Sequence, residues 1–348
     1  MESSTRYAVE VEKDPVYGVD AYLLRDHHVG SLARVLPALG NNLMGFAAGL
    51  PGRRLEVMLS PCPEEGVPRP TRFGNPLLFP FPNRVRKGTF KFQGHTYHLE
   101  PNTPEGHHIH GLVRDRPWQV QQATATPHGA VLRSRFAGER FSDVMRQYPF
   151  PFLLTATYIL HGNTLCLDVV AKNTGSRPLP MGFGIHPYFR LPLAEGGRPN
   201  VCRVQVPARR LWVLDAENLP TGRTEAVPPD LDFRSPRELG EAELDHVYTD
   251  IERNSGIASC RLQDPQARAE LTVRFGAEFP HVVLFAPAER PTFCFEPYTC
   301  ITDAPNMAAA GIDAGLVVLA PGESWRGGVA FEVAELAEEA PSTRGGPG

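Results

Sequence analysis

FLLTATYILHGNTLCLDVVAK, residues 152–172, contains two long apolar-rich runs that are joined by a short polar turn. The runs Phe152–His161 and Thr164–Lys172 are rich in branched, aromatic and threonine side chains, which favour extended strands. The segment His161-Gly162-Asn163 supplies residue types that allow a tight reversal of the chain. This stretch therefore predicts a long antiparallel β-hairpin.

The same pattern recurs along the chain. Gln93-Gly94 separates the runs TFKF and HTYHL, and 32 glycines and 35 prolines punctuate many further short apolar runs. Helical periodicity is weak, with short exceptions near Leu32–Leu39 and Pro236–Leu244. We therefore predict an all-β fold, a mostly antiparallel sandwich or barrel. It should form one domain over residues 1–335, followed by a flexible tail over 336–348 that ends in EEAPSTRGGPG.

Composition excludes several classes of protein. The formal net charge is -4 with no basic block, so a nucleic-acid partner is not expected. No run of about 18 apolar residues predicts a membrane span, and the polar N-terminus does not resemble a secretory signal. The six cysteines form no CxxC pair, which indicates reduced, mostly buried thiols in a cytoplasmic protein. We expect a monomer or a homodimer. Motifs for nucleotide binding, flavin binding and serine hydrolysis are also missing, so we expect no cofactor.

The segment MGFGIHPYFRL, residues 181–191, holds the first candidate group. If Met181–Phe189 is one strand, Gly182, Gly184 and His186 share a face. The glycines would leave space that a ligand could fill, with His186 as proton donor or hydrogen-bond partner. The alternative is that the glycines only allow close backbone packing.

A carboxylate in TFCFEPYTCITDAPN, residues 292–306, is the second candidate. Strand alternation places Phe293 and Phe295 on one face and Glu296 on the other. Pro297 is expected to mark the end of the strand. A carboxylate among apolar neighbours suits a general base, although an ordinary surface glutamate is the alternative.

EGHHIHGLVRDRPWQV, residues 105–120, carries histidines and arginines at close spacing. His108 and His110 at x-His-x-His spacing allow a metal site, but no further ligands stand near them. Contact with a sugar or phosphate is favoured over a metal, and an ordinary polar loop is the remaining alternative. Arg114 and Arg116 suit an anion, or pair with Asp115.

Two further polar residues stand in apolar surroundings. Arg84 follows the rigid stretch LLFPFPN and offers several donors to sugar hydroxyls, although a surface arginine is the alternative. Asp245 in LDHVYTD either accepts hydrogen bonds from hydroxyls or caps the next segment.

Taken in order, these segments resemble the aldose 1-epimerase (galactose mutarotase) family. The resemblance rests on the following stretches: FGNPLLFPFPNRVRKGTFKFQGHTYHLEPN, HGLVRDRPW, GFGIHPYFRL, LPTGR, LDHVYTD and CFEPYT, with Asn306 and LAPGESWRG after them. It implies a galactose-mutarotase-like β-supersandwich and cofactor-free exchange of α and β anomers of a small-molecule sugar. The form HGLVRDRPW is closer to the sugar-phosphate epimerase branch.

The resemblance also implies roles for particular residues. Glu296 matches the family's general base and His186 its general acid, and we expect them on opposite sides of the sugar ring. Arg84, His110 and Asp245 match its sugar-binding groups, and no metal is implied. A non-catalytic carbohydrate-binding or sensor protein is the main alternative, and a hydrolase or lyase would need a second carboxylate beside Glu296.

Overall fold

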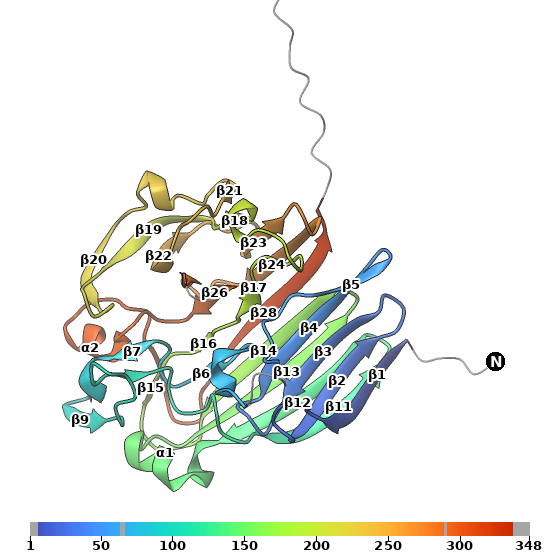
Figure 1. Ribbon diagram of the computed structural model, residues 1–348. Coiled ribbons are helices and arrows are strands. Elements are labelled where there is room, and N and C mark those ends of the chain that lie inside the picture. The colour runs from blue at the N-terminus through green and yellow to red at the C-terminus, as the bar shows by residue number, and fades with distance from the viewer. Residues whose placement is uncertain (1–5, 63–66, 289–290, 337–348) are drawn as a thin grey trace, which may run out of the picture.

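The computed structural model describes residues 6–62, 67–288 and 291–336, and three large sheets dominate it (Figure 1). Every pair of named strands in this part of the chain is antiparallel. The all-β, mostly antiparallel prediction is confirmed.

The N-terminal segment forms a five-stranded sheet in sequence order. Its strands are β1 (Tyr7–Lys13), β2 (Asp20–Asp26), β3 (Ser31–Leu36), β4 (Asn42–Leu50) and β5 (Arg53–Glu56). Strands β1 and β2 lie against β11, β12 and β13 of the next sheet, as Figure 1 also shows.

A nine-stranded sheet contains the hairpin from which the sequence analysis started. Its order is β11 (Gln119–Thr126), β12 (Gly129–Ala137), β13 (Phe152–His161), β14 (Thr164–Asn173), β28 (Ser324–Glu335), β24 (Ala269–Phe275), β23 (Ala258–Asp264), β18 (Arg203–Gln205) and β21 (Arg237–Glu238). His161 pairs with Thr164 across the turn, so the predicted hairpin is confirmed.

An eight-stranded sheet carries the candidate site. Its order is β20 (Pro220–Ala226), β19 (Ala208–Leu214), β22 (Leu244–Ile251), β25 (His281–Ala286), β26 (Thr292–Tyr298), β16 (Gly184–Ile185) and β6 (Leu77–Leu78), with β17 (Phe189–Arg190) also paired to β26. Smaller pairs complete the fold: β7 (Arg84–Val85) with β10 (His108–Ile109), β8 (Thr89–Phe92) with β9 (His95–His98), and β15 (Leu179–Met181) with β27 (Val317–Leu319). The β8–β9 pair is the hairpin predicted around Gln93-Gly94.

One large cluster of buried apolar side chains runs from Tyr7 to Val333 and includes residues of all three sheets. A second cluster, around Tyr298 and Met307, lies between the eight-stranded sheet and α2 (Ala304–Ala309). Burial of this apolar surface is the main force that holds the layers together. The predicted limits, a domain over residues 1–335 and a tail over 336–348, stay a prediction. Leu336 is still held by the hydrogen bond from its N–H to the Arg268 carbonyl (3.0 Å), and residues 337–348 lie outside the described part.

Short helices occur where the sequence did not predict them. The stretch near Leu32–Leu39 begins as strand β3, and the stretch near Pro236–Leu244 contains only β21 and the start of β22. The α-helices are instead α1 (Ser142–Gln147) and α2. Sheet pairing overrides local propensity in β3, whose buried residues alternate as a strand requires.

Neither α-helix in the described residues has the length and apolar character that crossing a bilayer requires. Four of the six cysteines are buried, as the sequence analysis expected, while Cys166 is exposed and Cys62 is partly exposed.

Candidate active site

Glu296 and His186 are in contact, although 110 residues separate them in the sequence. Glu296 lies on β26, and the segment from β16 to β17 runs alongside, with Gly184 paired to Tyr298 and Phe189 to Phe293. His186 stands between these two pairings. Its Nε2 lies 3.5 Å from Glu296 Oε1, and the two residues are only 7% and 2% exposed. The sheet therefore builds a buried imidazole–carboxylate pair.

This distance corrects one geometric expectation. A sugar ring does not fit between atoms 3.5 Å apart, so the two groups do not flank a substrate from opposite sides. They lie side by side, so a single ligand could contact both of them only through neighbouring atoms. The anomeric hydroxyl oxygen and the ring oxygen of an aldose are such neighbours, because both are bonded to the same carbon.

The predicted continuous strand Met181–Phe189 is wrong. It is broken into the short strands β15, β16 and β17. The space beside its glycines is also filled by protein: a Cβ on Gly184 would lie 2.4 Å from the Tyr298 ring, and one on Gly182 would lie 2.2 Å from Cys300 Sγ. The glycines therefore allow close packing against β26 and leave no space for a ligand there.

Strand β26 alternates as predicted. The Phe293 and Phe295 rings lie 4.7 Å apart on one face, and Cys294 and Glu296 lie on the other, near His186. Pro297 does not end the strand, because it pairs with Val282 and β26 continues to Tyr298.

Burial and a hydrogen bond from Tyr298 have opposite effects on the charge of the Glu296 carboxylate. The buried hydroxyl of Tyr298 donates a short hydrogen bond to Glu296 Oε2. Burial raises the pKa of Glu296 well above that of an ordinary glutamate, the Tyr298 hydrogen bond lowers this pKa, and the nearby charge of Asp245 raises it. Glu296 is therefore a stronger base than a solvated glutamate, and Tyr298 keeps its ionised form accessible.

A second tyrosine positions the imidazole. The Tyr188 ring stacks on His186 with a centroid distance of 4.4 Å, and its hydroxyl lies 3.4 Å from His186 Nε2. Phe285 packs edge-on against the same imidazole at 5.8 Å. These contacts restrict the ring to one orientation toward Glu296.

His110 reaches the site from a separate loop. Its ring centroid lies 5.2 Å from that of His186. The Asn83 backbone N–H donates to His110 Nδ1 (3.3 Å), which leaves the ring hydrogen of the neutral form on Nε2. Burial holds the pKa of His110 well below its usual range, and the positive charge of Arg114 is the next largest cause of this lowering. His110 is therefore a neutral hydrogen-bond donor.

His108 does not join His110 in a metal site. Its two ring nitrogens lie 2.7 Å from the Glu100 carbonyl oxygen and 3.2 Å from that of Gly111. Moreover, His110 has a φ of 68°, so the strand alternation stops at Ile109. The expectation that the two histidines share a strand face is wrong.

Asp245 is carried to the site by the register of the eight-stranded sheet. It pairs with Phe285, and Phe285 pairs with Cys294, so the three side chains form one row on the face that also carries Glu296. Asn218 Nδ2 donates to Asp245 Oδ2 (3.2 Å). Burial raises the pKa of Asp245, and the charge of Arg84 opposes this effect. Asp245 lies within β22 and does not cap a helix.

Arg84 faces this carboxylate from β7, where it pairs with Ile109 of β10. Asn83, with a left-handed φ of 59°, accepts hydrogen bonds at Oδ1 from the Arg84 backbone N–H (2.8 Å) and Nη1 (3.1 Å). Asp303 accepts from the backbone N–H of Arg86 (2.9 Å) and so anchors the same short strand. The turn thus directs the guanidinium toward the site.

The two arginines of HGLVRDRPW behave differently. Arg116 donates to the Leu112 carbonyl (2.8 Å) and forms an ion pair with Asp143, so its expected role in anion binding is wrong. Arg114 is partly buried, and burial lowers its pKa. The negative charge of Asp115 opposes this effect of burial, as the alternative of a pairing with Asp115 expected, and the charge of Arg114 in turn acts on His110. Within the described residues its guanidinium forms no ion pair or hydrogen bond.

The sequence analysis missed four residues that shape the site: Asn83, Tyr188, Asn218 and Tyr298. Tyr188 and Tyr298 each follow a candidate residue by two positions, and this spacing was the available signal. No local signal in the sequence marks Asn218.

Together with Cys294, the His186–Glu296 pair could supply three ligands to a metal ion. The ligand atoms of His186, Cys294 and Glu296 lie within 4.8 Å of one another. Thiolate, imidazole and carboxylate are the ligand types of Zn²⁺. Such an ion would occupy His186 Nε2 and Glu296 Oε1, so a bound metal would prevent these two atoms from exchanging protons with a ligand.

Comparison with known proteins identifies relatives of this chain in sequence and in fold. The family model described as aldose 1-epimerase matches residues 50–332. The uncharacterized protein YihR of Escherichia coli K12 is 27% identical over 252 residues, which cover 72% of this chain and 76% of YihR. Galactose mutarotase of Pongo abelii is 30% identical over 207 residues, or 58% of this chain and 57% of its own length. The structure of a galactose mutarotase-like protein from Clostridium acetobutylicum has a TM-score of 0.86 at 22% identity, covering 95% of this chain and 99% of that one.

The fold is therefore that of the galactose mutarotase-like proteins, with a buried imidazole–carboxylate pair at β26 of the eight-stranded sheet. The chain belongs to the aldose 1-epimerase family.

Proposed function

We propose that this protein is an aldose 1-epimerase, which interconverts the α and β anomers of a sugar by opening and reclosing its ring. The observation that carries the proposal is the buried contact between His186 Nε2 and Glu296 Oε1. The reaction removes one proton and delivers another at two neighbouring oxygens, and this pair presents one base and one acid side by side.

In the proposed reaction Glu296 is ionised and His186 is protonated. Glu296 takes the proton of the anomeric hydroxyl, the bond from the anomeric carbon to the ring oxygen breaks, and the ring oxygen receives the proton of His186. The aldehyde then turns about its bond to the next carbon. The hydroxyl attacks the other face of the carbonyl, and both protons return, so the enzyme is unchanged after the cycle.

The same pair has an inactive form in which the proton lies on Glu296 and His186 is neutral. Both forms hold one proton, so the pair titrates as a unit. The hydrogen bond from Tyr298 stabilises the ionised carboxylate and thus favours the active form. This gives Tyr298 a positioning role that needs no contact with the sugar.

Sugar hydroxyls are bound in this proposal by the surrounding polar groups. The neutral ring of His110 donates from Nε2, Arg84 donates from its guanidinium, and Asp245 accepts. Arg114 adds a positive charge beside His110 that Asp115 opposes without an ion pair, and this charge suits a substrate with an anionic group such as an aldose phosphate. The substrate class is therefore an aldose or an aldose phosphate.

The direct test follows the optical rotation of fresh α-glucose, α-galactose and α-glucose 6-phosphate with wild-type protein and with Glu296→Gln. Faster equilibration that the variant lacks would support the proposal. Tight sugar binding without faster equilibration would instead indicate the non-catalytic carbohydrate-binding protein. No effect on any aldose or aldose phosphate would reject the proposal.

A further inference from the structure

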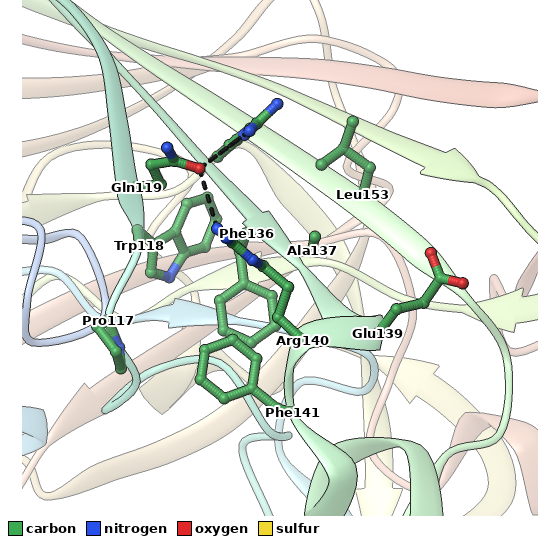
Figure 2. Close-up of a pocket in the computed structure, with 10 residues that line it drawn as sticks. Pro117, Trp118, Gln119, Phe136, Ala137, Glu139, Arg140, Phe141 and Leu153 are labelled. Carbon is green, nitrogen blue, oxygen red and sulfur yellow. Dashed lines mark hydrogen bonds between the residues drawn. The ribbon is translucent and has the colours of Figure 1, made fainter.

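A pocket of about 580 Å³ lies at one end of strands β11, β12 and β13, and the acid–base pair does not line it. Figure 2 shows its walls. They are made by Pro117–Gln119, Arg135–Ala137, Glu139–Phe141 and Leu153. The aldose 1-epimerase reaction proposed above gives these residues no role.

Two arginines converge on a single amide oxygen in this pocket. Arg135 donates from Nε (3.1 Å) and Nη2 (3.0 Å) to Gln119 Oε1, and Arg140 donates from Nη1 to the same atom (3.1 Å) (Figure 2). Gln119 is neutral, so it brings the two cations together without compensating their charge. Because the two guanidinium groups share one acceptor, their like charges lie close together and repel each other. An anion bound between them would relieve this repulsion.

No carboxylate in the described residues forms an ion pair with either arginine. Glu139 also lines the pocket, but its carboxylate points away from Gln119 in Figure 2. Arg116, which lies over the neighbouring Phe141 ring at 5.7 Å, is already paired with Asp143. The unpaired charge is therefore confined to Arg135 and Arg140.

An aromatic stack forms the wall next to these cations. The Phe136 and Phe141 rings are parallel at 4.7 Å, and Trp118 lies 5.7 Å from Phe136. Phe136 and Trp118 are buried, whereas Phe141 and Leu153 remain partly exposed. Because the stack is anchored in the core, the pocket offers a fixed apolar surface beside two cations.

We propose that this pocket binds a small phosphate monoester whose organic part is apolar or aromatic. Two guanidinium groups match the double negative charge and the several oxygens of a phosphate group, and the partly exposed apolar side chains cover the organic part. This site is separate from the sugar site, although residues 110–119 connect His110 to Gln119.

The test is isothermal titration calorimetry with phenyl phosphate as the probe, and with inorganic phosphate, benzoate and phenol for comparison. Phenyl phosphate should bind tightest, and its affinity should fall with added salt. Arg135→Gln and Arg140→Gln should each weaken binding by on the order of tenfold. Arg133→Gln is the matched control, because it removes an exposed arginine of the same strand that does not line the pocket.

Two further variants separate this site from the sugar site. Glu296→Gln and Arg114→Gln should leave the affinity for phenyl phosphate unchanged. Loss of binding in Arg114→Gln would assign the anion to the sugar site and overturn the proposal. So would equal losses in Arg133→Gln and Arg135→Gln, or inorganic phosphate binding as tightly as phenyl phosphate. Thermal unfolding of each variant checks that the fold is intact.

Discussion

Replacing Tyr298 by phenylalanine should move the acid limb of the pH–rate profile to higher pH. The substitution removes the hydroxyl that donates to Glu296 Oε2 and keeps the ring against which Gly184 packs. In the proposed reaction Glu296 takes a proton only when it is ionised, and the lost hydrogen bond stabilised that form. The pKa of Glu296, already raised by burial, should therefore rise further.

The size of the shift follows from the strength of the hydrogen bond. A bond to a charged acceptor contributes about 1.5–3 kcal/mol, and one to a neutral acceptor about 0.5–1.5 kcal/mol. The difference of about 1–1.5 kcal/mol corresponds to about one pKa unit. On the acid limb the rate at a fixed pH should thus fall by about tenfold, while the maximal rate should change far less.

The assay is the rate of optical-rotation change above the spontaneous rate, measured across both limbs of the profile. Tyr148→Phe serves as control, because Tyr148 is equally buried and donates to the Pro180 carbonyl (2.7 Å), away from the pair. It should leave the profile unchanged. An acid limb that stays in place or moves to lower pH in a folded Tyr298→Phe protein would refute this account of Tyr298.

Other predictions concern the pair and the arginines. Glu296→Gln and His186→Asn should each lower the rate by about 10²–10⁴-fold, and the double variant should be scarcely slower than the poorer single one in the same assay. The folded-state pKa of Glu296 is raised, so its contribution to stability is present at low pH and is lost as pH rises through that pKa. The melting temperature of Glu296→Gln should therefore rise relative to that of wild type as pH rises. A difference in melting temperature that stays constant with pH would contradict this. Arg114→Gln should reduce kcat/KM for glucose 6-phosphate more than for glucose, whereas Arg116→Gln should cost at most about 1 kcal/mol of stability and leave that ratio unchanged. Chelators should not lower the rate, and loss of activity restored by added zinc would show instead that the pair acts through a metal.

The class of the sheets and the face of β26 that carries Glu296 could be predicted from local sequence, because each depends on short-range patterns. Alternation along Thr292–Tyr298 placed Glu296 opposite Phe293 and Phe295, and the Gly162-Asn163 turn fixed the long hairpin. The ordered set of motifs supplied the family, which the match over residues 50–332 confirms. The assignments of roles to Glu296 and His186 remain predictions.

Tertiary structure alone decided which of these residues meet. His186 reaches Glu296 because both β16 and β17 pair with β26, and Asp245 joins them through the register of β22, β25 and β26. Arg114 and Arg116 are two residues apart, yet one faces the site and the other pairs with Asp143. Sequence periodicity determines which face of a strand a side chain occupies. Its partner across that face depends on pairings between separate segments, more than a hundred residues apart for β16 and β26, and no local pattern encodes these pairings.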